Sequence, residues 1–202
     1  MTAVAVVFDL GDVLIRWRPQ DAVAAGLGED EAAKFLAADD LDFRAYNHLQ
    51  DLGRSFADAE AELGRTHPQW QQHAVTYREH FPLSLSPIEA NVALLRDLYD
   101  AGVPLYALTN WSAELFPQAL DRFDFLGLFR DIVVSGAEGV AKPDPAVFEL
   151  LQQRIGLPLT DCVFVDDSER NVEAAAAAGL DAIRFTPGTD LRLELRRRGL
   201  PA

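Results

Sequence analysis

The stretch AVAVVFDLGDVL, residues 3–14, decides the fold class of this chain. Six apolar residues run without a break up to Asp9, where a carboxylate interrupts them. A continuous apolar run of this length is typical of a β-strand that is covered on both faces, as the strands of a parallel sheet are. Four further apolar runs follow, at residues 103–108, 131–134, 162–165 and 182–185. The chain is therefore expected to contain buried parallel strands.

Helical signals lie between these runs. Ser86, Pro87 and Glu89 form the pattern of a capping serine, a first-turn proline and a reciprocal glutamate, which predicts a helix start. Gly102 is placed to close that helix, and Asp144 followed by a proline predicts a second start. The predicted helices cover residues 90–101, 146–154, 169–178 and 191–198. Because strands alternate with helices, we expect an α/β fold with a doubly wound, Rossmann-like parallel sheet.

The segment 16–85 interrupts this alternation. Its patterns are helical and largely polar, with no strand run among them. The helical patterns lie at residues 21–26, 30–38, 41–49 and 56–63. We therefore expect a core made of residues 1–15 and 86–202, with residues 16–85 inserted after the first strand as a small helical cap.

Composition and charge exclude several classes of protein. The chain has 202 residues, of which 49% are apolar and 25% charged, which is ordinary for a globular protein and excludes wholesale disorder, collagen and disulfide scaffolds. Its net charge of -14 disfavours nucleic acid and anionic membranes as partners. Cys162, the single cysteine, cannot form an intramolecular disulfide, and the first apolar run is too short to span a membrane. We expect a cytoplasmic protein.

Polar residues follow the apolar runs at the points where the strands end. Ligands bind outside the carboxyl ends of the strands in an open α/β sheet, so these residues are expected to share one edge. Crowded carboxylates disfavour one another's ionisation unless a cation lies between them, and hard oxygen ligands suit Mg²⁺. The pattern favours a magnesium site over the alternative, in which the acids only cap neighbouring elements. The residues are Asp9, Thr109, Asn110, Lys142, Asp166 and Asp167.

Four motifs in register carry a resemblance to a known family. They are FDLGDVL at 8–14, LTN at 108–110, KP at 142–143 and DDS at 166–168, the last followed by Asn171. With these motifs the chain resembles the haloacid dehalogenase-like hydrolase superfamily over almost its whole length. The FDLGDV phrase, the early insertion and VDDSERN at 165–171 are most similar to small sugar-phosphate phosphatases of the alpha-glucose-1-phosphatase type.

The resemblance implies a reaction and a role for each motif residue. Such an enzyme hydrolyses a small phosphorylated metabolite, here a sugar phosphate by likeness, and Asp9 becomes an aspartyl phosphate. Lys142 neutralises charge and keeps Asp9 ionised. Hydrogen bonds to the phosphoryl oxygens are implied for Thr109 and Asn110, with Asp12 a candidate contact beside them. The Mg²⁺ ligands implied are Asp9, Asp166, Asp167 and the backbone carbonyl of Gly11.

Position 11 departs from the family pattern. Phosphatases of this superfamily usually carry a second aspartate two residues after the nucleophile, which protonates the leaving oxygen and then activates water. This chain has Gly11 there. Asp12 is adjacent, but one step along a tight loop redirects a side chain, so Asp12, His48 and a bound water remain alternative proton donors. Asp12 is equally consistent with a solvated or capping loop acid.

Gly11 also keeps two other functions open. Haloacid dehalogenases lack the second aspartate as well and use the nucleophile to attack carbon without a metal. The adjacent acids Asp166 and Asp167 favour phosphate chemistry, because without a metal they would repel a carboxylate substrate. A phosphate-binding module without catalysis would not need the nucleophile Asp9. Substrate contacts in or near the cap are candidates at Arg16, Trp17, Arg18, Arg44, Tyr46, Asn47, His48 and Trp111, each of which also suits simple packing or charge balance.

Overall fold

A five-stranded parallel sheet forms the centre of the protein. The computed structural model describes residues 3–202, and its strand order is β5-β4-β1-β6-β7. The strands are β1 (Ala5–Phe8), β4 (Leu105–Thr109), β5 (Asp131–Val134), β6 (Cys162–Asp166) and β7 (Asp181–Arg184). β1 lies between β4 and β6, with Phe8 opposite Ala107 and Val165. The expected doubly wound α/β fold is confirmed, and its central strand leads directly to Asp9.

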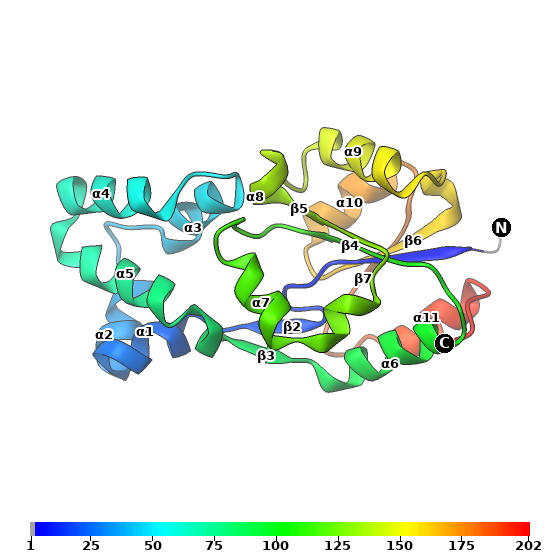
Figure 1. Cartoon of the computed structure of the whole chain (residues 1–202), viewed down its shortest axis with the longest axis horizontal. Coiled ribbons are helices and arrows are strands. Elements are labelled where there is room, and N and C mark those ends of the chain that lie inside the picture. Colours follow the sequence, from blue (N-terminus) through cyan, green and yellow to red (C-terminus); the bar gives the residue numbers. More distant parts are fainter. Residues whose placement is uncertain (1–2) are drawn as a thin grey trace.

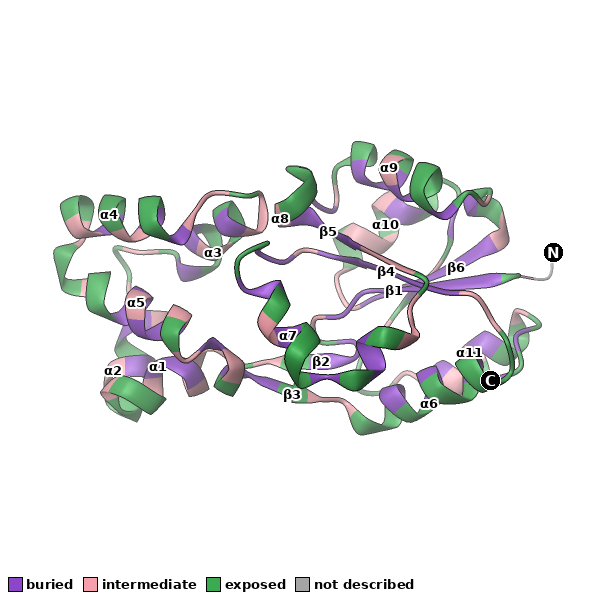
Figure 2. Ribbon diagram, viewed as in Figure 1, coloured by how far each residue is buried: buried purple, intermediate pink, exposed green. Residues whose placement is uncertain are grey.

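Helices cover both faces of the sheet (Figure 1). Val7 and its neighbours on one face pack with α9 and α10, whereas Val6 and Phe8 pack with α6 and α11. Side chains of β1 therefore alternate between two apolar layers, which is why the whole strand is apolar. Figure 2 shows the buried strands between half-exposed helices. The helices are α6 (Glu89–Asp100), α9 (Pro145–Ile155), α10 (Glu169–Ala177) and α11 (Leu191–Arg197).

The five helices between β1 and α6 form a separate group at the carboxyl ends of the strands (Figure 1). We call this group, residues 19–79, the cap. Its aromatic centre includes Phe43, whose ring centroid lies 5.3 Å from that of Phe35 and 5.1 Å from that of Tyr77. The helices are α1 (Pro19–Leu27), α2 (Glu29–Leu36), α3 (Phe43–Asp51), α4 (Phe56–Thr66) and α5 (Gln71–Glu79). Because the chain enters the cap from the carboxyl end of β1, the cap lies over the strand ends.

Two short strands connect the cap to the core, and they correct the sequence analysis. β2 (Ile15–Trp17) and β3 (Leu85–Pro87) pair antiparallel, with Arg16 opposite Ser86. The prediction that Ser86 caps a helix was therefore wrong. The helix α6 begins at Glu89, and the residue before it provides no side-chain cap. Pairing with a distant strand outweighed the local capping pattern. The expectation of no strand within 16–85 was wrong at both ends for the same reason.

Several elements were not predicted. They are α5, α7 (Phe116–Arg122), α8 (Ser135–Glu138) and the short 3-10 helices at Pro68–Trp70, Phe81–Ser84, Asp124–Leu128 and Leu159–Asp161. The predicted helix start at Asp144 is confirmed, since its side chain accepts a hydrogen bond from the backbone of Ala146. Cys162 is buried. Among the described residues, no helix combines the length and apolar character that crossing a membrane requires.

Candidate active site

Asp9 and Lys142 form a buried ion pair at the carboxyl end of β1. Lys142 Nζ lies 3.0 Å from Asp9 Oδ1 and 2.6 Å from Asp166 Oδ2. The side chains of Lys142 and Asp166 are fully buried, whereas that of Asp9 keeps 10% of its exposure. A buried ammonium is stable only when it is paired and hydrogen-bonded, and two carboxylates meet that need here. Asp9 is thus the member of this cluster that faces outward.

The Lys142 backbone is held by Asn110. Asn110 Oδ1 accepts a hydrogen bond from Lys142 N, and Asn110 Nδ2 donates to Lys142 O, each at 2.9 Å. This double contact fixes the loop from which the lysine reaches Asp9. Phosphoryl binding by Asn110 stays a prediction, and in this structure its side-chain amide holds the Lys142 loop. Thr109, the other residue predicted for that role, is buried as the last residue of β4.

Asp166 is fixed on both of its oxygens. Its Oδ1 accepts from Ser168 N at 2.8 Å and from Asn171 Nδ2 at 3.0 Å, while Oδ2 receives Lys142. A buried carboxylate with these hydrogen bonds holds its geometry rigidly. Asp167, the next residue in the chain, is more exposed and therefore freer to bind a ligand.

The three carboxylates can share one metal ion. One oxygen each from Asp9, Asp166 and Asp167 lie within 4.8 Å of one another. Burial and the neighbouring acids together raise the pKa of Asp9 to about 8, against the opposing effect of Lys142. Burial also raises the pKa of Asp167. One ammonium therefore does not balance three acids, and a hard divalent cation such as Mg²⁺ fits this donor set.

Asp12 has a structural partner. Its Oδ1 accepts a hydrogen bond from Trp17 N at 3.2 Å, and its φ of 50° places it in the left-handed region that aspartate tolerates. The carboxylate thus closes the turn between β1 and β2. The helix cap considered from the sequence is not formed, because Trp17 lies in β2 and α1 begins at Pro19 without a side-chain cap. Gly11, its neighbour, forms a bridge with Ile15.

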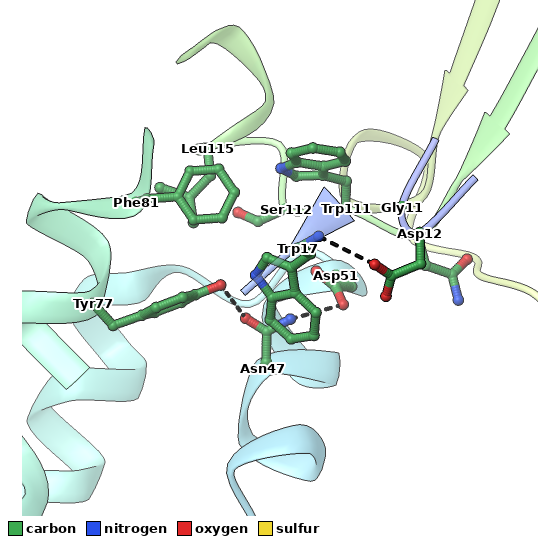
Figure 3. Close-up of a pocket in the computed structure, with 11 residues that line it drawn as sticks. Gly11, Asp12, Trp17, Asn47, Asp51, Tyr77, Phe81, Trp111, Ser112 and Leu115 are labelled. Atoms are coloured by element: carbon green, nitrogen blue, oxygen red, sulfur yellow. Dashed lines mark hydrogen bonds between the residues drawn. The ribbon is translucent and has the colours of Figure 1, made fainter. Parts of the chain in front are cut away.

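A pocket of about 90 Å³ opens beside Gly11, between the cap and the core (Figure 3). Aromatic rings form much of its wall, together with two acids, two amides and a serine. No lysine, arginine or histidine is among the residues that line it in the described part of the chain. The lining residues are Gly11, Asp12, Trp17, Asn47, Asp51, Tyr77, Phe81, Asn110, Trp111, Ser112 and Leu115.

A chain of hydrogen bonds crosses the cap side of this pocket. Tyr77 Oη donates to Asn47 Oδ1, and Asn47 Nδ2 donates to Asp51 Oδ2, each at 3.1 Å (Figure 3). Burial raises the pKa of Asp51 to about 7, although the hydrogen bonds from Asn47 and the Ser112 backbone oppose the rise. The indole N–H of Trp111 is buried and has no partner among residues 3–202. The wall of the pocket therefore includes the acid Asp51 and an indole whose buried N–H is unpaired in the described chain.

The candidate contacts in or near the cap divide into two groups. Trp17, Asn47 and Trp111 line the pocket. The others do not: Tyr46 is buried in the cap, Arg44 borders a second, open hollow of about 620 Å³, and Arg16, Arg18 and His48 are exposed. Sequence analysis missed Asp51, Tyr77 and Phe81, because an acid at a helix end and two aromatic residues have no distinctive pattern.

Comparison with known proteins gives a consistent result. A family model described as haloacid dehalogenase-like hydrolase matches residues 4–179. A sesquiterpene phosphatase of Aspergillus oryzae is 28% identical to this chain, over 96% of the chain and 95% of that protein. A phosphoglycolate phosphatase of Cereibacter sphaeroides is 31% identical, over 91% of the chain and 85% of that protein.

Two solved structures share the fold. One is a HAD family enzyme of Bacteroides thetaiotaomicron in a magnesium complex, with a TM-score of 0.76, 18% identity and coverage of 97% of this chain and 100% of that chain. The other is the L-2-haloacid dehalogenase of Xanthobacter autotrophicus, with a TM-score of 0.68, 20% identity and coverage of 95% and 81%. At these identities the structural likeness shows the fold, which phosphate ester hydrolysis and dehalogenation share.

Proposed function

Because this chain belongs to the haloacid dehalogenase-like hydrolases, we propose that it is a Mg²⁺-dependent phosphomonoesterase that transfers the phosphoryl group of a small metabolite to Asp9. The observation that carries the proposal is the cluster in which Lys142 lies between Asp9 and Asp166, with Asp167 close enough to share a metal ion. An aspartyl-phosphate intermediate divides one difficult displacement into two easier ones.

Each residue of the cluster has a defined part in this reaction. Asp9 attacks phosphorus with the oxygen that faces outward, and Lys142 balances negative charge as it develops. Asp9, Asp166 and Asp167, together with the Gly11 carbonyl, would hold Mg²⁺, which when bound neutralises charge on the transferring group. Thr109 contributes a hydroxyl to the phosphoryl oxygens. Asn110 acts by holding the Lys142 loop.

The pocket beside Gly11 receives the leaving group. Its aromatic wall favours an uncharged group with an apolar face, and the free indole N–H of Trp111 favours a group with a hydroxyl or ether oxygen. Since no cation lines the described pocket, a carboxylated leaving group would lie there without charge compensation. A sugar phosphate meets these conditions, as does the phosphate ester of another neutral alcohol.

Dehalogenation remains the second candidate because Gly11 and the shared fold are consistent with it. Three crowded carboxylates oppose it, since without a metal they repel the carboxylate that a haloacid carries. Halide release from a haloacid, measured with chelator present, separates the two reactions.

A phosphate-release screen tests the proposal. The screen compares sugar phosphates, nucleotides and small phosphoesters in Mg²⁺ and in chelator, with Asp9→Asn beside the unaltered protein. We expect release in Mg²⁺ alone and none from Asp9→Asn. Faster release from phosphoglycolate than from hydroxyethyl phosphate, its neutral counterpart, would contradict the leaving-group assignment. Halide release without phosphate release would replace the proposed function with dehalogenation, and neither product would indicate a binding module.

A further inference from the structure

The proposed reaction lacks a proton donor at the usual position. An alcohol leaves phosphorus readily only when its oxygen receives a proton, and Gly11 has no side chain to provide one. The Asp12 carboxylate is exposed and accepts the Trp17 N–H at the turn into β2. His48, the other candidate from the sequence, is exposed on α3 and does not line the pocket. The donor is therefore to be sought elsewhere in the pocket.

We propose that Asp51 of the cap is this donor: its carboxyl protonates the leaving oxygen and then, as a carboxylate, activates the water that hydrolyses the phosphoenzyme. This inference rests on the proposed phosphatase function. Asp51 and Gly11 line the same pocket, one from the end of α3 in the cap and the other from the loop after β1 (Figure 3). The cap thus supplies the acid that the core lacks.

The position of Asp51 is fixed on both its side chain and its backbone. Asn47 Nδ2 donates to Oδ2, and Asn47 is itself held by Tyr77 Oη. Ser135 Oγ of the core donates to the Asp51 carbonyl at 2.5 Å and accepts from Trp111 N at 3.0 Å. Cap and core are therefore joined at this residue, and a proton donor needs such a fixed geometry.

The loop that follows Asp51 lies directly against the core. A Cβ added to Gly53 would lie 3.1 Å from Gly136 O, and the φ of 99° at Gly53 is one that glycine adopts without strain. Glu114 of the core accepts the Phe56 N–H at 3.0 Å. These contacts hold the end of α3 at the mouth of the site.

The surroundings of Asp51 keep its proton near neutral pH. Burial raises its pKa to about 7. The negative end of the α3 dipole also disfavours the carboxylate. The titratable groups that face it across the described pocket are Asp12 and Tyr77. Neither is a cation, so neither stabilises the carboxylate. A carboxyl in this range can both donate and accept a proton at neutral pH.

The two steps balance without a further reactant. In the first, an Asp9 oxygen bonds to phosphorus, the bond to the leaving oxygen breaks, and the Asp51 proton moves to that oxygen. In the second, a water oxygen bonds to phosphorus, the bond to Asp9 breaks, and the water proton returns to Asp51. Inorganic phosphate and the alcohol are the products.

Leaving-group dependence tests the proposal, because para-nitrophenolate leaves without a proton and an alkoxide does not. For Asp51→Asn we expect kcat/KM to fall by about 10²-fold or more with an alkyl phosphate and by less than about threefold with para-nitrophenyl phosphate. Slow hydrolysis of the phosphoenzyme should then give a burst of nitrophenolate equal to the active sites. Asp30→Asn, an exposed acid on α2 of the same cap, is the matched control. Equal loss with both substrates, or no loss, overturns the role of Asp51.

A pH profile provides an independent readout, and it remains available if Asp51→Asn does not fold. With the alkyl phosphate, kcat/KM of the unaltered protein should fall above about neutral pH as Asp51 loses its proton. Asn47→Ala removes a hydrogen bond that favours the carboxylate, so it should shift this fall to higher pH. An unshifted profile overturns the proposal. If the unaltered protein releases no phosphate from any substrate, the phosphatase function itself is refuted.

Discussion

Asp51→Asn is expected to stabilise the protein while lowering its activity, and the gain should grow with pH. Burial raises the Asp51 pKa from its ordinary 3.8 to about 7. Between these values the unfolded chain has released the proton and the folded protein still holds it. Stability contributed by this group is therefore lost as pH rises across that window, and the loss is complete above the folded pKa. Asparagine does not titrate and has no such loss.

The size of the effect follows from the same values. One pKa unit corresponds to about 1.4 kcal/mol, so the rise of the Asp51 pKa to about 7 sets an upper limit of about 4 kcal/mol on the stability lost at alkaline pH. Asp51 keeps partial exposure to the pocket, and water there lowers the penalty. We expect Asp51→Asn to gain about 2–4 kcal/mol in free energy of unfolding near pH 8 and well under half of that near pH 4.

Urea unfolding across this pH range, with chelator present, measures the difference directly. Titrations elsewhere in the protein cancel, because both proteins share them. Asp30→Asn, whose carboxylate is exposed, should stay within about 0.5 kcal/mol at every pH. A difference that does not change with pH, or a variant that loses stability as pH rises, would refute the account of Asp51 as a buried acid.

Three further predictions concern the core. Lys142→Met leaves two buried carboxylates without their cation. It should therefore abolish phosphate release and lower the free energy of unfolding in urea by about 3–5 kcal/mol. A loss of less than about 1 kcal/mol would contradict the buried pairing. Asp167→Asn removes a proposed metal ligand, so the Mg²⁺ concentration for half-maximal activity should rise about tenfold or more, and an unchanged value would exclude it as a ligand. Gly136→Ala places a Cβ 2.5 Å from the backbone nitrogen of Ala113, so thermal unfolding should show a loss of about 1–3 kcal/mol in stability. Gly127→Ala, which has open space around its Cβ, should change stability little. Equal effects of the two substitutions would refute the close approach at Gly136.

The sheet could be predicted because its strands are buried on both faces. Each strand of a parallel sheet is then a continuous apolar run, and such runs are visible without knowledge of the rest of the fold. β2 and β3 are different, since each has three residues and forms only because residues 15–17 meet residues 85–87. The local signal at Ser86 favoured a helix cap, and the distant pairing outweighed it.

The same distinction applies to the site. Asp9, Lys142 and the two acids at the end of β6 could be brought together from sequence, because parallel strands end at one edge. The role of Asn110 could not, since its amide pairs with a backbone 32 positions away. Asp51 was missed because its place in the pocket depends on how the cap lies against the core, which a local pattern does not encode.

The central claim is that Asp9 carries the phosphoryl group during turnover. The most direct test mixes the enzyme with Mg²⁺ and a phosphate ester that it hydrolyses, quenches the reaction rapidly in acid, and maps the peptides. The account predicts an acid-stable phosphate on the peptide that contains Asp9, in larger amount for Asp51→Asn than for the unaltered enzyme when para-nitrophenyl phosphate is the substrate. Steady phosphate release with no phosphate on that peptide in either protein would contradict it.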